Sequence, residues 1–207
     1  MKLVVDSPST VSATQEMVDD IVLDILPRQG AWTEEAYLWL TDHTNRLLEY
    51  TDGHLEVLPM PTDKHQAVLK YLFLIFVAVI EPLGGAVRFA PLRLRIRERK
   101  YREPDLLLVR AAGDPRRQDR YWLGADLVLE VVSADKPERD RLDKREDYAE
   151  AHVPEYWIVD LPNHHIVVLR LDGNTYVEHG VFGPGVRATS ALLPNLAVDV
   201  DAVLNAD

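Results

Sequence analysis

The order of helical and strand patterns predicts an α/β or α+β fold, in which helices flank a mixed β-sheet. Two short apolar runs, residues 105–109 and 126–132, have the length and composition of buried strands. A helical pattern over 137–152 follows the second run, and a third strand pattern over 156–160 comes next. That order is typical of a crossover connection within a sheet, so we expect these strands at its centre.

The composition is that of an ordinary globular protein. The chain has 207 residues, of which 47% are hydrophobic and 28% charged, enough for one large domain with a substantial core. There is no cysteine, which excludes disulfides and thiolate metal sites and suits the cytoplasm, where we expect the protein. We expect residues 1–30 to form a partly flexible amino-terminal arm and residues 31–207 to form a single domain.

A hairpin is predicted around Asp52-Gly53, because this dipeptide favours a tight turn between two strands. With the turn there, Glu49 faces Glu56 across the strand pair. Two carboxylates side by side destabilise the pair unless a cation or a proton lies near them. The alternative is that both side chains point into water.

The other elements follow from periodicity, caps and turn residues. They are a short helix over 14–26, a helix over 33–41 capped by Thr33, a long helix over 62–81, strands from Val87 onward, a strand over 165–171 after a turn at Pro162-Asn163, and a strand or short helix near 196–204. The most apolar stretch, 71–80, has about half the length of a membrane span, so we expect a buried helix and no membrane partner.

Two carboxylates interrupt apolar strands. Asp105 opens the first run, and Glu130 lies inside the second, on the same face as Val128 and Val132. A charged residue in a central strand is unfavourable unless it is paired or binds a metal ion. We interpret both acids as functional; a salt bridge to a neighbouring arginine is the alternative for Glu130.

A lysine follows on the predicted helix over 137–152. Asp140, Lys144 and Tyr148 are spaced four residues apart and share one stripe of that helix. Taken alone, Asp140 and Lys144 form an ordinary solvated helix pair. Because the helix follows the strand that carries Glu130, a short connection would bring Lys144 over the carboxylate.

The net charge of −11 argues against DNA binding through bulk charge. One local basic strip exists between Arg88 and Arg102, and Arg93, Arg95 and Arg97 alternate with apolar residues there. These three arginines are the candidates for contacts with DNA phosphates. The alternative is a solvated strand face, or one paired with the abundant acids.

Other chemistries find little support. The histidines, His65, His164 and His165 among them, lack the paired spacing of a helical metal site and are expected in surface or hydrogen-bonded roles. Ser133 has no nucleophile-elbow context, and no phosphate-binding glycine loop is present.

Four segments together resemble a known family: residues 103–109, 126–133, 140–148 and 153–160. Upstream, Glu49 with Asp52-Gly53 and the pair His65-Gln66 match as well. In this order the motifs resemble the restriction-endonuclease-like family often called Uma-two, a former domain of unknown function within the PD-(D/E)xK nuclease superfamily. The resemblance covers about residues 33–200.

The resemblance implies a restriction-endonuclease-like mixed β-sheet flanked by helices, with a Mg²⁺- or Mn²⁺-dependent site that hydrolyses DNA phosphodiester bonds. Asp105 and Glu130 would be the metal-binding acids and Glu49 an additional acid. The usual lysine position holds Val132, so Lys144 on the following helix would take the catalytic role. We expect DNA as a partner and a homodimer. The alternative is a catalytically silent nuclease-fold module for binding or assembly.

Overall fold

The structure, a computed structural model, describes residues 26–132 and 143–207. Three sheets are present in this part of the chain, and the largest has the strand order β10-β9-β8-β7-β6-β3. Its strands are β3 (Ala86–Phe89), β6 (Leu106–Val109), β7 (Leu127–Val132), β8 (Glu155–Asp160), β9 (His165–Asp172) and β10 (Thr175–Phe182). Residues 14–25 of the predicted helix over 14–26 lie outside the described residues, as do residues 1–25 of the predicted arm.

The centre of the larger sheet is as predicted. β7 and β8 are parallel, and α4 (Lys144–Glu150) lies in the connection between them. β6 pairs with β7, and β9 with β8, in antiparallel orientation, which makes the sheet mixed. Residues 137–142 of the predicted crossover helix lie outside the described part. β10, an additional edge strand, was not predicted.

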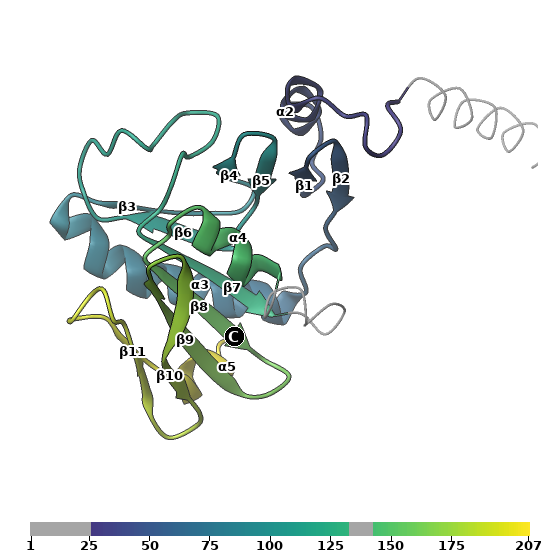
Figure 1. Cartoon of the computed structure of the whole chain (residues 1–207). Coiled ribbons are helices and arrows are strands. Elements are labelled where there is room, and N and C mark those ends of the chain that lie inside the picture. Colours follow the sequence, from purple (N-terminus) through teal and green to yellow (C-terminus); the bar gives the residue numbers. More distant parts are fainter. Residues whose placement is uncertain (1–25, 133–142) are drawn as a thin grey trace, which may run out of the picture.

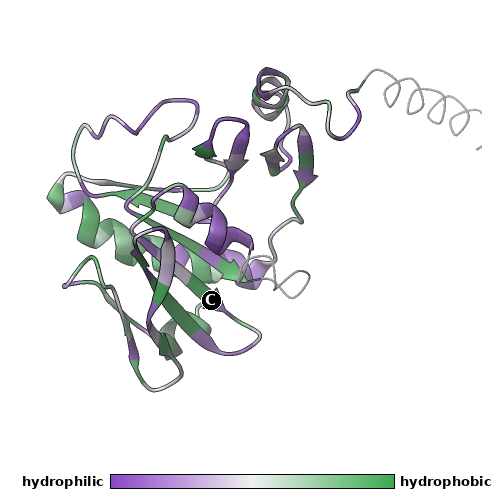
Figure 2. Ribbon diagram, in the orientation of Figure 1, coloured by the Kyte–Doolittle hydropathy of each residue, from purple (hydrophilic) through white to green (hydrophobic). Residues whose placement is uncertain are grey.

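Helices cover both faces of this sheet (Figure 1). α3 (Asp63–Ile80) packs its apolar side on one face, and α4 lies on the other. Thr62 caps α3 by accepting a hydrogen bond from the His65 N–H, and Gly84, with a φ of 84°, ends the following 3-10 turn η1 (Glu81–Leu83). Figure 2 shows the contrast between the largely apolar α3 and the polar α4.

The segment Asp63–Leu83 is long and apolar enough to cross a membrane, judged by length and composition, and 28% of the window tested is buried in the fold. Its buried residues belong to the largest hydrophobic cluster, together with side chains of β6, β7 and β8. The predicted packing of this helix in the core is confirmed.

A smaller sheet has the order β2-β1-β5-β4 and lies beside α2 (Glu34–Asp42) (Figure 1). Its strands are β1 (Leu48–Thr51), β2 (His54–Val57), β4 (Leu94–Arg97) and β5 (Lys100–Arg102). The hairpin has the predicted register, with Glu49 opposite Glu56. Asp52 and Gly53 have φ angles of 47° and 92°, as a primed hairpin turn requires.

β4 carries the predicted alternation of arginines with buried Leu94 and Ile96. It belongs to the smaller sheet, because it turns directly into β5 and pairs with it. The part of the basic strip in β4 and β5 therefore belongs to the smaller sheet, whereas Arg88 lies in β3 of the larger sheet.

The carboxy-terminal segment forms β11 (Arg187–Thr189), β12 (Ala197–Asp199) and α5 (Val200–Leu204). The predicted element near 196–204 is thus a strand followed by a short helix. Fully buried Glu155 fixes this segment to the larger sheet, because its carboxylate accepts hydrogen bonds from Ser190 Oγ and Leu192 N–H, both at 2.7 Å, and from Trp157 Nε1 at 2.6 Å.

Candidate active site

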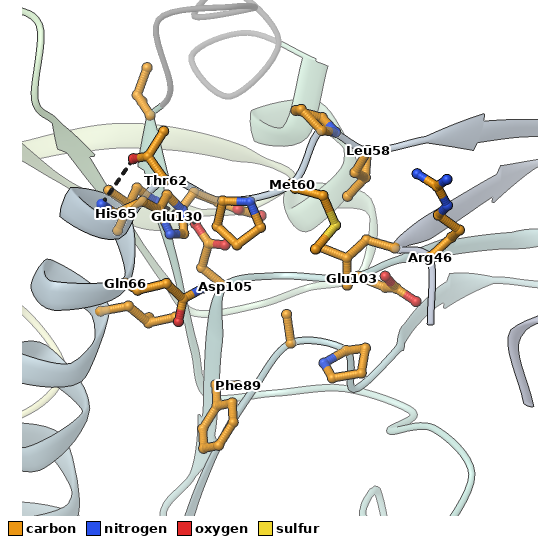
Figure 3. Close-up of a pocket in the computed structure, with 18 of the residues that line it drawn as sticks. Arg46, Leu58, Met60, Thr62, His65, Gln66, Phe89, Glu103, Asp105 and Glu130 are labelled. Carbon is orange, nitrogen blue, oxygen red and sulfur yellow. Dashed lines mark hydrogen bonds and ion pairs between the residues drawn. The ribbon is translucent and has the colours of Figure 1, made fainter. Parts of the chain in front are cut away.

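A pocket of about 890 Å³ opens between the two sheets at the carboxyl end of β7. Its walls come from the loop between β2 and α3, the first turn of α3, the loop between β3 and β4, and the ends of β6 and β7. Figure 3 shows Asp105 and Glu130 beside His65 on one side of this pocket, with Glu103 and Arg46 on the other. Lys144 also lines it.

Asp105 lies opposite Glu130. β6 and β7 are antiparallel with Leu106 opposite Leu129, so the same register extended by one residue pairs Asp105 with Glu130 on one face. Asp105 Oδ2 accepts a hydrogen bond from the Val131 N–H at 2.7 Å and lies 3.0 Å from His65 Nε2. The structure therefore brings the two predicted acids together, and His65 has the expected hydrogen-bonded role.

Glu130 is only 3% exposed and meets two side chains of α4. Lys144 Nζ lies 2.7 Å from Glu130 Oε1, and the Tyr148 hydroxyl donates a short hydrogen bond to the same oxygen. Burial raises the pKa of Tyr148 well above its usual value, so this hydroxyl stays protonated and donates. Lys144 and Tyr148, one helical turn apart, thus both contact the Glu130 carboxylate, which agrees with their predicted position on one face of the helix.

Glu49 brings a second buried carboxylate to the same lysine. It is 1% exposed, and its oxygens lie 3.9 Å from Lys144 Nζ and 3.4 Å from Arg102 Nε. Of the two alternatives for the Glu49/Glu56 pair, the structure shows nearby cations for Glu49, which does not point into water. Lys144 therefore links the acids of the smaller and the larger sheet.

Glu103 was not predicted as a site residue. It is 3% exposed, accepts a hydrogen bond from the Leu48 N–H at 3.1 Å, and lines the pocket. Burial, together with the nearby charge of Glu49, raises the pKa of Glu103 to about 8. The signal in the sequence was its position two residues before Asp105, on the same side of an extended segment.

The carboxylate oxygens of Asp105 and Glu130 are suitable ligands for a hard divalent cation. In the described ranges, no cluster of three or more His, Asp or Glu side chains is arranged to hold a metal ion. Mg²⁺ keeps several waters and needs only one or two protein carboxylates, which Asp105 and Glu130 provide. Asp105 Oδ1 takes no hydrogen bond from the described residues, because both contacts of this carboxylate use Oδ2.

The arginines in and immediately before β4 are largely paired with acids. Arg93 Nη1 lies 2.9 Å from Asp42, and Arg97 lies 2.7 Å from Asp52 and 2.9 Å from Glu150. For Arg93 and Arg97 the structure thus shows the alternative in which acids neutralise the strip. Arg95 is half-buried, and its contact with DNA stays a prediction.

The geometry and the fold together define a protein of the restriction-endonuclease-like class. The family model described as "Uma2: Putative restriction endonuclease" matches residues 34–201. The chain belongs to this family. No curated protein matches the sequence.

Among solved structures, the chain is similar to a putative nuclease belonging to DUF820 from Anabaena variabilis ATCC 29413. The two share 18% sequence identity, the alignment covers 76% of this chain and 89% of that chain, and the TM-score is 0.63. The likeness shows that the predicted fold is correct.

Proposed function

We propose that this protein is a metal-dependent endonuclease that hydrolyses DNA phosphodiester bonds through a PD-(D/E)xK-type site, with Mg²⁺ or Mn²⁺ as the cofactor. The observation that carries the proposal is the register of β6 and β7, which places Asp105 opposite Glu130, with Lys144 Nζ 2.7 Å from the second acid. Glu130 is 3% exposed and the side chain of Asp105 18%, so the desolvation of these two acids must be offset by nearby charges or by a bound cation.

Asp105 and Glu130 would hold the cation, with the Val131 carbonyl as a further oxygen donor. A bound divalent cation supplies Lewis-acid polarisation of the scissile phosphate and lowers the pKa of an attacking water. His65 and the Val131 N–H keep the Asp105 carboxylate in place through their contacts with Oδ2. Tyr148 does the same for Glu130, because a ligand whose rotamer is fixed loses less entropy on binding.

Lys144 carries the positive charge that the reaction requires. As phosphorus gains a fifth oxygen, negative charge grows on the phosphate, and an ammonium group within a water-poor pocket stabilises it. Lys144 is 4% exposed, so its charge is weakly screened. Glu49, 3.9 Å from Lys144 Nζ, would add a second negative charge near the ammonium group and complete the outer shell of acids.

The test is metal binding and cleavage by Asp105→Asn and Glu130→Gln proteins, compared with Glu178→Gln, which changes an exposed acid of β10 outside the pocket. We expect wild type and Glu178→Gln to bind Mn²⁺ in calorimetry and to cut DNA in Mg²⁺, and the two site variants to do neither while keeping a cooperative thermal transition. Wild-type cleavage by either site variant would refute the assignment.

The same experiment separates this function from a catalytically silent module for binding or assembly. The ion pairs of Arg93 and Arg97 favour that second candidate, because they leave less positive surface for DNA. A wild-type protein that gives neither heat nor a thermal shift with Mn²⁺ would support it. We further propose a cytoplasmic homodimer, since cutting both strands commonly requires two sites; light scattering of the purified protein tests the dimer.

A further inference from the structure

We propose that the pocket takes a single unpaired nucleotide, so that this protein acts on DNA with unpaired bases rather than on continuous duplex. The inference rests on the proposed nuclease function and names its substrate class. It follows from the depth of the site, the chemistry of its walls and the pairing of the basic residues around it.

The depth of the site comes first. The cavity of about 890 Å³ falls within the range of roughly 300–1,000 Å³ typical of pockets that enclose a small molecule. Glu130 is 3% exposed, so a phosphate reaches it only from within the pocket. A phosphate on the surface of a regular duplex is flanked by stacked pairs, whereas an extruded nucleotide carries its own phosphate into such a cavity.

The walls are suited to a base. One side is the loop Leu58-Pro59-Met60-Pro61, and another is Phe89-Ala90-Pro91. Figure 3 shows Leu58 and Met60 along one side of the pocket and Phe89 along another. Met60 is 67% exposed and Phe89 50%, which leaves apolar surface in water at the pocket lining. Every base has a flat apolar face that covers such surface by stacking, without regard to sequence.

The charges disfavour a duplex-binding surface. Binding along duplex DNA draws its free energy mainly from cations that neutralise phosphates. Within the described chain, five basic residues of the strip from Arg88 to Arg102 already form ion pairs with acids. They are Arg93, Arg97, Arg99, Lys100 and Arg102. Arg46, exposed and also part of the pocket lining, has no ion pair among these residues and is available to one phosphate. Stacking therefore has to supply binding energy that phosphate contacts do not.

Binding to three DNA molecules of equal length tests the proposal: a full duplex, a duplex with one unpaired 2-aminopurine, and a single strand carrying 2-aminopurine. EDTA prevents cleavage. We expect the two DNAs with unpaired bases to bind wild type more tightly than the duplex, and the 2-aminopurine emission to be quenched on binding. Phe89→Ala and Met60→Ala should each weaken this binding by about tenfold and reduce the quenching.

Trp39→Ala is the matched control, because Trp39 is 59% exposed on α2 and does not line the pocket. It should bind the unpaired DNA as wild type does. Phe89 also packs edge-on against Phe73, so Phe89→Ala could lose binding through a defect in folding. Met60 lies on an exposed loop, so Met60→Ala tests the pocket wall without that defect.

Equal affinity of wild type for all three DNAs, or full quenching in both pocket variants, would overturn the proposal. These readouts do not involve cleavage. A preference for unpaired DNA without any metal-dependent cleavage would therefore support the nucleotide pocket and reject the nuclease function. Cleavage without this preference would support the nuclease function and reject the nucleotide pocket.

Discussion

Lys144 Nζ lies 2.7 Å from Glu130 Oε1 and 3.9 Å from Glu49 Oε1, so one buried ammonium group stands between carboxylates of two different sheets. The two acids are 3% and 1% exposed. Neither is stable as a buried anion without a nearby cation, and the lysine is correspondingly costly to bury alone. Lys144 therefore depends on these acids and Glu130 on Lys144, while Glu49 also has Arg102 at 3.4 Å.

The first prediction concerns Lys144→Met. Loss of the ammonium group should slow single-turnover cleavage by about 100-fold or more, because it removes charge stabilisation at the phosphate. Lys70→Met is the control, since Lys70 is an exposed lysine of α3 whose Nζ, among the residues that the structure describes, donates to the Asp207 carbonyl. Cleavage by Lys144→Met at the rate of the control would contradict the role of the lysine.

Tyr148→Phe tests the positioning of Glu130. Removing the hydroxyl that holds Oε1 should weaken Mn²⁺ affinity or cleavage by about 10- to 100-fold, as is usual for groups that orient a ligand. Tyr176→Phe removes another buried hydroxyl, one that donates to the Val153 carbonyl outside the pocket. A merely structural role of Tyr148 predicts the same Mn²⁺ affinity in both variants.

Glu103 predicts a dependence of stability on pH. Its pKa is raised from 4.5 to about 8 by burial and by Glu49, so the folded protein holds a proton that the unfolded chain releases. This contribution to the free energy of unfolding is fully present below about pH 4.5 and is lost as the pH rises to about 8. Urea unfolding in EDTA should therefore show wild type losing stability relative to Glu103→Gln across that window. A difference that stays constant with pH would rule out the raised pKa.

The ion pairs of the arginines in and immediately before β4 lead to a prediction for a salt titration of DNA binding. If Arg93, Arg95 and Arg97 each neutralised a duplex phosphate, the triple alanine variant would lower the slope of log affinity against log salt by about 2.7. Because Arg93 and Arg97 are bound to acids, we expect the slope for duplex DNA to stay near that of wild type. If the slope instead falls by the full amount of about 2.7, the three arginines do contact duplex phosphates.

Glu155 predicts a purely structural effect. Its alanine variant leaves the donors from Trp157, Ser190 and Leu192 without a buried acceptor, which should lower the free energy of unfolding by about 3 kcal/mol. Glu178→Ala, on the exposed part of β10, should change it by less than about 0.5 kcal/mol. Mn²⁺ affinity should be the same in both variants, measured well below their melting temperatures.

Local chemistry explains which parts of the fold were predictable. The turn at Asp52-Gly53 fixes the hairpin register within a few residues, so the pairing of Glu49 with Glu56 followed from the sequence. Thr33 and Thr62 cap their helices by contacts three residues away. The hairpin of β4 and β5 is local, but its place in a separate sheet depends on the pairing of β5 with β1, which is distant in the sequence and carries no local signal.

The site was predictable to the extent that burial leaves a pattern. Asp105 and Glu130 were visible because charge interrupts apolar strands, and Lys144 because a helix follows the strand. Their mutual placement requires the register between β6 and β7, which sequence spacing does not determine. The contact of His65 with Asp105 joins residues of different elements for the same reason.

The position of Gly53 has a consequence for how this site evolves. A Cβ atom at Gly53 would lie 2.4 Å from the Gly30 carbonyl oxygen, so the hairpin tip is wedged against the chain that precedes α2. The opposite end of the same short strand pair carries Glu49. Selection for catalysis would then extend to a turn that does not line the pocket, and homologues should tolerate change there less than in other surface loops.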